Sequence, residues 1–142
     1  MYKSILLPVD LGHKSSWEKA APEAVTLAKQ HGAKIHLLTV IPDFGMAVVG
    51  TFFPPDYAEQ ALQSGSEKLA ALASEIIPGD LLAKVHTAHG SAYQEIINTA
   101  NEQGCDLIVM ASHRPEMSDY LLGPNAARVA RHANQSVMIV RN

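Results

Sequence analysis

Residues 106–125 read Asp106-Leu107-Ile108-Val109-Met110-Ala111-Ser112-His113-Arg114-Pro115-Glu116-Met117-Ser118-Asp119-Tyr120-Leu121-Leu122-Gly123-Pro124-Asn125. The apolar run at the start predicts a strand, and the pattern after residue 123 predicts a helix, with a loop between them. In an open α/β sheet, ligands bind just outside the carboxyl end of a strand. A helix start adds free backbone N–H groups and a positive dipole end, which suit an anion. The stretch therefore predicts a nucleotide-phosphate site of unusual composition.

Outward from this stretch, predicted strands alternate with predicted helices. The strands are expected at residues 2–9, 35–41, 82–88, 105–111 and 137–140, and the helices at 17–31, 56–77, 93–103 and 124–133. All of these strands except the third are nearly continuous apolar runs, which is typical of a parallel sheet covered by helices on both faces. Because no linker or repeat interrupts the chain, residues 1–142 are expected to form one α/β domain.

Local signals suggest how some of these helices begin and end. Ser15 or Ser16 can cap the first helix, and Pro22 either kinks that helix or marks its regular start. Gly32 suits the residue just after its end. Ser91 is expected to be the N-cap of the third helix.

Composition and charge argue against several classes of partner. The formal net charge is −3, which favours neither nucleic acid nor an anionic membrane surface. The N-terminal apolar run is too short for a signal peptide, and no run has the length of a membrane span, so a cytoplasmic protein is expected. The single cysteine, Cys105, fits a reducing compartment and is expected to be a small buried residue.

Seven histidines would indicate a metal site only if they clustered. His86 and His89 are three residues apart on a strand and its exit, so they need not face one another. The spacing of the histidines shows no convincing ligand set, and no metal site of the protein's own is predicted.

Several stretches resemble segments of a known family. They are Ile5-Leu6-Leu7-Pro8-Val9-Asp10, Leu38-Thr39-Val40-Ile41, Gly90-Ser91-Ala92, Asp106-Leu107-Ile108-Val109-Met110, Ala111-Ser112-His113-Arg114-Pro115 and Tyr120-Leu121-Leu122-Gly123. In order and spacing they are similar to the universal stress proteins over essentially the whole chain. The last two stretches resemble the short-chain branch of the F/G type.

This resemblance implies a Rossmann-like, five-stranded parallel sheet of order 3-2-1-4-5. Asp10 and residues 111–125 would then meet at the switch point between the first and fourth strands. The resemblance also implies an adenine nucleotide as ligand, ATP or AMP, with or without Mg²⁺. It further implies a homodimer through the last strand, Val137 to Val140, and an apolar edge strand of this kind does need a partner.

Carried over position by position, the resemblance implies a set of nucleotide-binding residues. They are Pro8, Val9, Asp10, Val40, Met110, Ala111, His113, Arg114, Gly123, Pro124 and Asn125. Asp10 would reach the ribose or a phosphate-bound metal, but its carboxylate can equally cap the loop that follows. Val40 would offer backbone groups to adenine, or be plain core. His113 would bind phosphate, or be structural.

The phosphate loop departs from the glycine pattern of ATP-binding members. Ala111 and Arg114 stand where the first two glycines belong, the following spacer is one residue shorter, and only Gly123 is retained. Arg114 crowds the loop but can itself bind phosphate bidentately. Pro124 replaces a hydroxyl residue and removes up to two donors, although a proline suits the first helical position. Phosphate binding is therefore expected to be weakened or altered.

The sequence favours a binding module over an efficient enzyme. It contains no Walker lysine motif and no paired acids suited to two metal ions. We expect a nucleotide-binding regulatory module of the stress response, with at most slow hydrolysis or autophosphorylation. The alternative is a nucleotide-free dimeric interaction protein whose phosphate site has lapsed. The apolar loop 44–53 would be a lid, an interface or a cover for the core.

Overall fold

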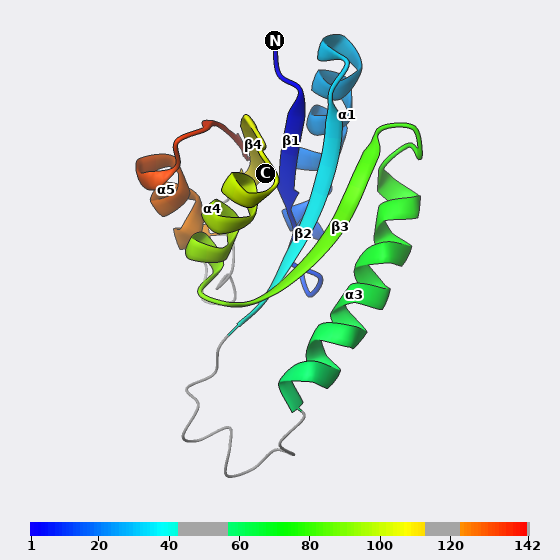
Figure 1. The fold of residues 1–142 in the computed structure, drawn as a ribbon, viewed down its shortest axis with the longest axis vertical. Helices are drawn as coiled ribbons and strands as arrows, with labels where there is room; N and C mark the ends of the chain where they lie inside the picture. Colours follow the sequence, from blue (N-terminus) through cyan, green and yellow to red (C-terminus); the bar gives the residue numbers. More distant parts are fainter. Residues whose placement is uncertain (43–56, 113–122, 142) are drawn as a thin grey trace.

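The fold is given by a computed structural model that describes residues 1–42, 57–112 and 123–141 (Figure 1). The expectations for the apolar loop 44–53, for His113 and for Arg114 lie outside the described residues.

Five parallel strands form one sheet in the order β3-β2-β1-β4-β5. The strands are β1 (Ser4–Pro8), β2 (Lys34–Pro42), β3 (Leu82–Gly90), β4 (Leu107–Ser112) and β5 (Ser136–Arg141). The predicted α/β class and the predicted strand order are confirmed. Since the order reverses between β1 and β4, the switch point lies between these two strands.

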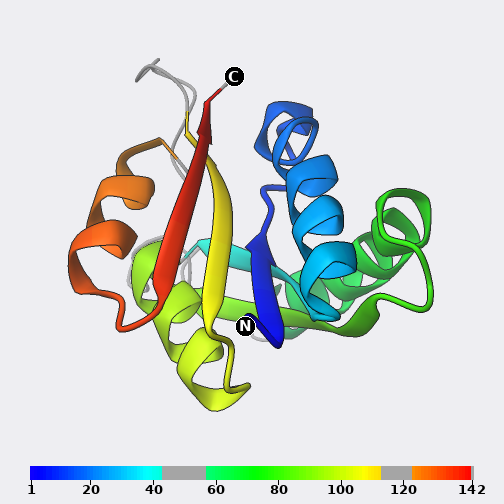
Figure 2. The same ribbon diagram turned by 90° about the horizontal axis from the view of Figure 1, so that it is seen from above.

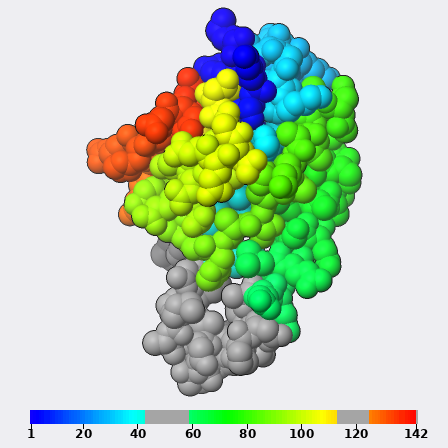
Figure 3. Space-filling view, viewed as in Figure 1, coloured from blue at the N-terminus to red at the C-terminus, as the bar shows by residue number. Residues whose placement is uncertain are grey.

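The helices lie on both faces of the sheet, as predicted (Figure 2). They are the 3-10 helix η1 (Lys14–Ser16), α1 (Ala20–His31), α3 (Tyr57–Ile76), α4 (Ala92–Glu102) and α5 (Gly123–His132). Helices α1 and α3 pack on one face, and α4 and α5 pack on the other. In Figure 3, atoms of β2 and β3 remain visible beside α4. None of the helices in the described ranges is long and apolar enough to cross a membrane.

Side-chain alternation along the strands divides the core in two. Ile5 and Leu7 of β1 face α1 and α3, whereas Leu6 of the same strand faces α4 and α5. All three side chains are fully buried. Burial on both faces explains why the central strands are continuous apolar runs, with no alternation of polar residues.

The regular part of the first helix starts near Pro22, which confirms one of the two alternatives for this proline, and it starts later than the expected residue 17. Helix α1 starts at Ala20, and Lys19 occupies its N-cap position without a side-chain capping bond. The expectation that Ser15 or Ser16 caps it is therefore wrong. Pro22 lies in the first turn, where a missing N–H leaves no helical bond unmade. The other end is confirmed, because Gly32 is the C-cap residue with a left-handed φ of 68°.

Helix α4 is capped from another helix. Ser91 occupies the predicted N-cap position in an extended conformation, but its side chain makes no capping bond. The Tyr93 N–H instead donates to Oδ1 of Asn125, at 3.1 Å. The position predicted for Ser91 is right and its capping role is wrong. The start of α4 is thereby tied to the start of α5.

Candidate functional site

The carboxyl ends of β1 and β4 lie at the switch point of the sheet, and there the two strands part. Their pairing covers only Ile5 with Leu107 and Leu6 with Ile108, although both strands continue beyond it. β1 stays with β2, since its last residue still pairs with Leu38. Beyond these two pairs, no ladder hydrogen bonds join β1 to β4. This is the carboxyl end of the strands, where α/β proteins bind ligands.

Pro8 explains why the β1–β4 ladder stops. The Asp106 N–H donates to the Ser4 carbonyl at 2.9 Å, so Ser4 presents its backbone groups toward β4. Alternation gives Leu6 and Pro8 the same direction. Proline has no N–H, so at Pro8 the ladder toward β4 loses a donor. The proline thus favours separation on the β4 side without weakening the β2 side.

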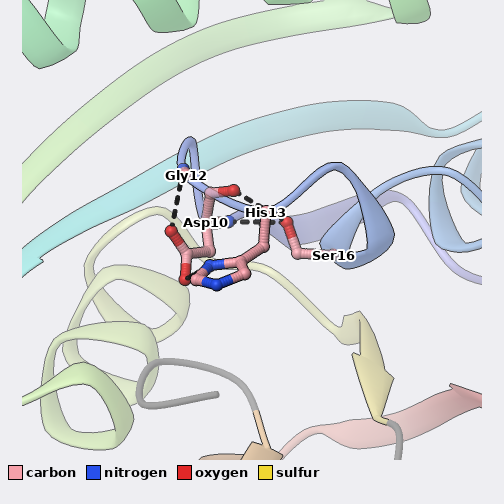
Figure 4. A network of polar contacts seen from close by, with 4 residues as sticks. All are labelled: Asp10, Gly12, His13 and Ser16. Atoms are coloured by element: carbon pink, nitrogen blue, oxygen red, sulfur yellow. Dashed lines mark hydrogen bonds and ion pairs between the residues drawn. The ribbon is translucent and has the colours of Figure 1, made fainter. Parts of the chain in front are cut away.

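Asp10 lies directly beyond β1 in a local network of polar contacts (Figure 4). Its side chain is buried; Oδ1 accepts the Gly12 N–H at 3.0 Å, and Oδ2 lies 2.9 Å from His13 Nδ1. The Ser16 hydroxyl accepts the Asp10 N–H at 2.8 Å and donates to the Asp10 carbonyl at 3.1 Å. The carboxylate is thus held in one orientation, and each of its oxygens has a second lone pair with which to accept a ligand's donor.

The backbone N–H and C=O of Val40 point to the β1 side of β2, toward the switch point. The Leu38 carbonyl faces β1, since it accepts the Val9 N–H at 2.8 Å. Two residues further along β2, Val40 has its N–H and C=O on the same side, beyond the last β2 residue that pairs with β1. One donor and one acceptor therefore lie side by side at the switch point.

The side chains of four candidate residues are buried in the two hydrophobic cores. Val9 and Ala111 are buried on the α1 side of the sheet, whereas Val40 and Met110 are buried on the α4 side. A ligand outside the strand ends would therefore meet only the main chain of these residues.

Gly123 and Pro124 lie in the first turn of α5, as expected. No acidic residue lies in that turn, so no carboxylate there opposes an anion. The Asn125 side chain is buried, and its oxygen accepts the Tyr93 N–H. The structure therefore gives this side chain a packing and capping role, which the sequence had not suggested.

A second polar feature lies between the start of α4 and the exposed part of α5. Tyr93, Ala127, Arg128, Arg131 and His132 line a pocket of about 350 Å³. The Arg128 guanidinium lies over the Tyr93 ring, 5.4 Å from its centroid. Such a cationic pocket is a competing place for phosphate groups, so a binding test must distinguish it from the switch point.

Sequence reasoning missed a pair of histidines on neighbouring strands. His36 Nδ1 of β2 lies 2.9 Å from His86 Nε2 of β3, with the rings stacked at a centroid distance of 5.1 Å. Burial lowers the pKa of both imidazoles, and the charge of Lys84 lowers both further. Only the register between β2 and β3 reveals the pair. The described residues contain no group of three or more potential metal ligands.

Cys105 behaves as predicted. Its side chain is buried, and the Ser4 hydroxyl donates to its sulfur at 3.5 Å. Burial raises the pKa of this thiol, which argues against a reactive thiolate.

Comparison with known proteins identifies the family. The universal stress protein family model matches residues 1–141. Universal stress protein G from Escherichia coli O157:H7 is 35% identical over 143 residues, covering 99% of this chain and all of the relative. The counterpart from Salmonella typhimurium is 34% identical over 145 residues, with the same coverage. The likeness to the G-type branch is thus confirmed.

Solved structures agree in fold. The structure of the protein MJ0577 superposes with a TM-score of 0.77 at 26% identity, covering all of this chain and 97% of the other. A universal stress protein in complex with cAMP has a TM-score of 0.56 at 21% identity, with coverage of 99% and 97%. With the sheet order and the sequence matches taken together, this chain belongs to the universal stress protein family.

Proposed function

We propose that this protein is a regulatory module that binds an adenine nucleotide, ATP or AMP, at the switch point between β1 and β4. The observation that carries the proposal is the parting of β1 and β4 after Leu6, with the buried Asp10 carboxylate oriented beside it. In α/β folds of this kind, ligands generally bind just outside the carboxyl ends of the strands at the switch point.

The chemistry of the site matches the parts of an adenine nucleotide. The Asp10 carboxylate can accept hydrogen bonds from ribose hydroxyls or ligate a phosphate-bound Mg²⁺. The N–H and C=O of Val40 match an acceptor and a donor on the edge of adenine. The start of α5 and the Arg114 guanidinium would serve the phosphates. The cAMP complex of a related protein supports the same ligand class.

Calorimetric titration with ATP, with and without Mg²⁺, tests this function. We expect wild-type binding in the micromolar range. Arg114→Ala should weaken it by about 10–100-fold, because a hydrogen bond to a charged group contributes about 1.5–3 kcal/mol. Pro124→Ser should tighten binding, because it returns an N–H and a hydroxyl to the helix start.

A second candidate function is a nucleotide-free interaction protein, favoured by Ala111, Arg114 and Pro124 in the phosphate loop. A silent wild type with binding gained in Pro124→Ser would select this candidate, because the scaffold would be intact and the site lapsed. Labelled phosphate transferred from ATP to the protein would instead indicate slow autophosphorylation.

The proposed module is a homodimer through β5. This strand is at the edge of the sheet, and both Met138 and Ile139 are 36% exposed. An apolar edge strand of this kind invites pairing with a second copy. Sedimentation should give a dimer for wild type and a monomer for Ile139→Lys. Ala127→Lys, a charge added at an exposed position of α5, is the matched control and should leave the dimer intact.

A further inference from the structure

The His36–His86 pair lies on the β3 side of β2, away from β1 and the proposed nucleotide site. His36 is paired with Lys84, and His86 with Leu38, so the two imidazoles are diagonal neighbours on the sheet face that carries Leu38. The two strands pair along most of their length, which holds the imidazoles on a rigid support. Both histidines are half-buried, and atoms of β2 and β3 are visible at the surface beside α4 (Figure 3).

The two facing nitrogens have the separation of neighbouring corners in a metal complex. Imidazole nitrogens bind such ions at about 2.0–2.1 Å, so two of them at about 2.9 Å form an angle of about 90° at the metal. That angle suits the square-planar and tetragonal geometries of Cu²⁺ and Ni²⁺. A tetrahedral Zn²⁺ ion would need the nitrogens about 3.3 Å apart.

We propose that Nδ1 of His36 and Nε2 of His86 form a two-point binding site for a late transition-metal ion. The expected order of affinity is Cu²⁺ over Ni²⁺ and Zn²⁺, from both the nitrogen separation and the general order for nitrogen ligands. Imidazole is a suitable ligand for all three ions.

Binding needs a change of tautomer and a turn of both rings, because the hydrogen-bonded nitrogens point at one another and not at a common point beside them. Without metal, the contact at 2.9 Å is a hydrogen bond in which one of the two facing nitrogens carries a proton. That proton moves to the other nitrogen of the same ring, so both facing nitrogens present lone pairs. They form two metal–nitrogen bonds and displace two waters from the hydrated ion. The protein's proton count and the metal's oxidation state do not change.

The site is open. Since the described residues supply no group of three ligands, water or another small ligand would occupy the remaining positions. Lys84, on the same face and opposite His36, places a positive charge near the metal. This arrangement fits an exchangeable ion and not a closed structural site. It also provides an electrostatic test of location.

Copper titration followed by electron paramagnetic resonance tests the proposal, with CuSO₄ as the probe. At the first equivalent we expect two equatorial nitrogens in wild type, and loss of that signal in His36→Asn and in His86→Asn. Each variant should also weaken copper binding by at least ~10-fold, since one of two ligands is lost. His89→Asn, three residues along the same strand, is the matched control and should keep the wild-type spectrum.

Lys84→Gln gives a test that keeps both imidazoles. Removing the ammonium should tighten Cu²⁺ and Ni²⁺ binding several-fold, because the repulsion between like charges is removed. Circular dichroism confirms that each variant is folded. If folded His36→Asn and His86→Asn bind the first equivalent of copper as wild type does, the metal lies on other histidines and the proposal is overturned. Unchanged affinity in Lys84→Gln would contradict it in the same way.

Discussion

Oδ2 of Asp10 and Nδ1 of His13 lie 2.9 Å apart, just beyond the end of β1. Together with the Gly12 N–H, this contact fixes the carboxylate at the edge of the sheet where β1 and β4 part. Because the carboxylate is already fixed, it would lose no rotamer freedom on binding, and the proposed site would be organised before a nucleotide arrives. The loop contacts and the proposed binding role therefore support each other.

Asp10→Asn tests that role. The variant keeps the shape of the side chain but loses its charge, so ATP affinity should fall by about 10–100-fold. Asp106→Asn is the control, because the Asp106 carboxylate accepts the N–H groups of Lys3 and Ser4 at the opposite edge of the sheet. Calorimetry should show unchanged affinity for the control. Equal loss in both variants would point to a general effect on the fold.

Pro8→Ala tests the cause of the strand separation. The new N–H at position 8 would face β4, and a backbone hydrogen bond there contributes about 0.5–1.5 kcal/mol. A nucleotide would then have to break this bond, so its affinity should fall by about 2–10-fold. Hydrogen exchange should show protection of the new amide. Pro78→Ala, beyond the end of α3, changes the unfolded chain similarly and should not affect binding. A rapidly exchanging amide with unchanged affinity would rule out the proline mechanism.

Asn125→Ala tests the cap of α4. Losing the oxygen that accepts the Tyr93 N–H should lower the free energy of unfolding by about 0.5–2 kcal/mol. Ser91→Ala removes a side chain at the N-cap position that makes no capping bond, so its effect should stay within about 0.5 kcal/mol. Urea unfolding measures both. The reverse ranking would mean that Ser91 caps the helix in solution.

The histidine pair predicts a pH dependence of stability. Burial, aided by the charge of Lys84, lowers the pKa of His36 and His86 from 6.5. Below that value the unfolded chain binds more protons than the folded chain. The stabilisation is therefore fully present above pH 6.5 and is lost as the pH falls through the folded-state pKa values. Urea unfolding from pH 7.5 to 5 in the presence of a chelator should show this decline, and the double variant His36→Gln/His86→Gln should flatten it. An unchanged slope in the double variant would show that other groups cause the decline.

The helices and strands could be predicted from the sequence, because segments that become buried have a recognisable pattern of apolar residues. β1 and β4 are apolar runs since both of their faces are covered, and Gly32 reports a left-handed helix end. The strand order came from the family resemblance, since an apolar run does not name its neighbours. The register that opens the switch point at Pro8 is likewise visible only when the strands are paired.

The misjudged features depend on contacts between distant parts of the chain. Ser91 has the residue type and place of a cap, but Asn125, more than thirty residues later, makes the bond. In the sequence, His86 stands near His89, whereas its partner in the structure, His36, lies fifty residues away on the adjacent strand. Local rules rank residues by type and spacing. They cannot decide which of several polar groups the tertiary structure brings into contact.

The most direct test of a nucleotide site at the switch point is an amide NMR titration with ATP, because it locates the ligand on the chain. Binding at the switch point should give saturable shifts at Val9, Asp10, Val40 and Ala111, and none at Lys3 and Asp106, which lie at the opposite end of the strands. Shifts confined to the cationic pocket of Tyr93, Arg128 and Arg131, or no shifts at millimolar ATP, would contradict a nucleotide site at the switch point.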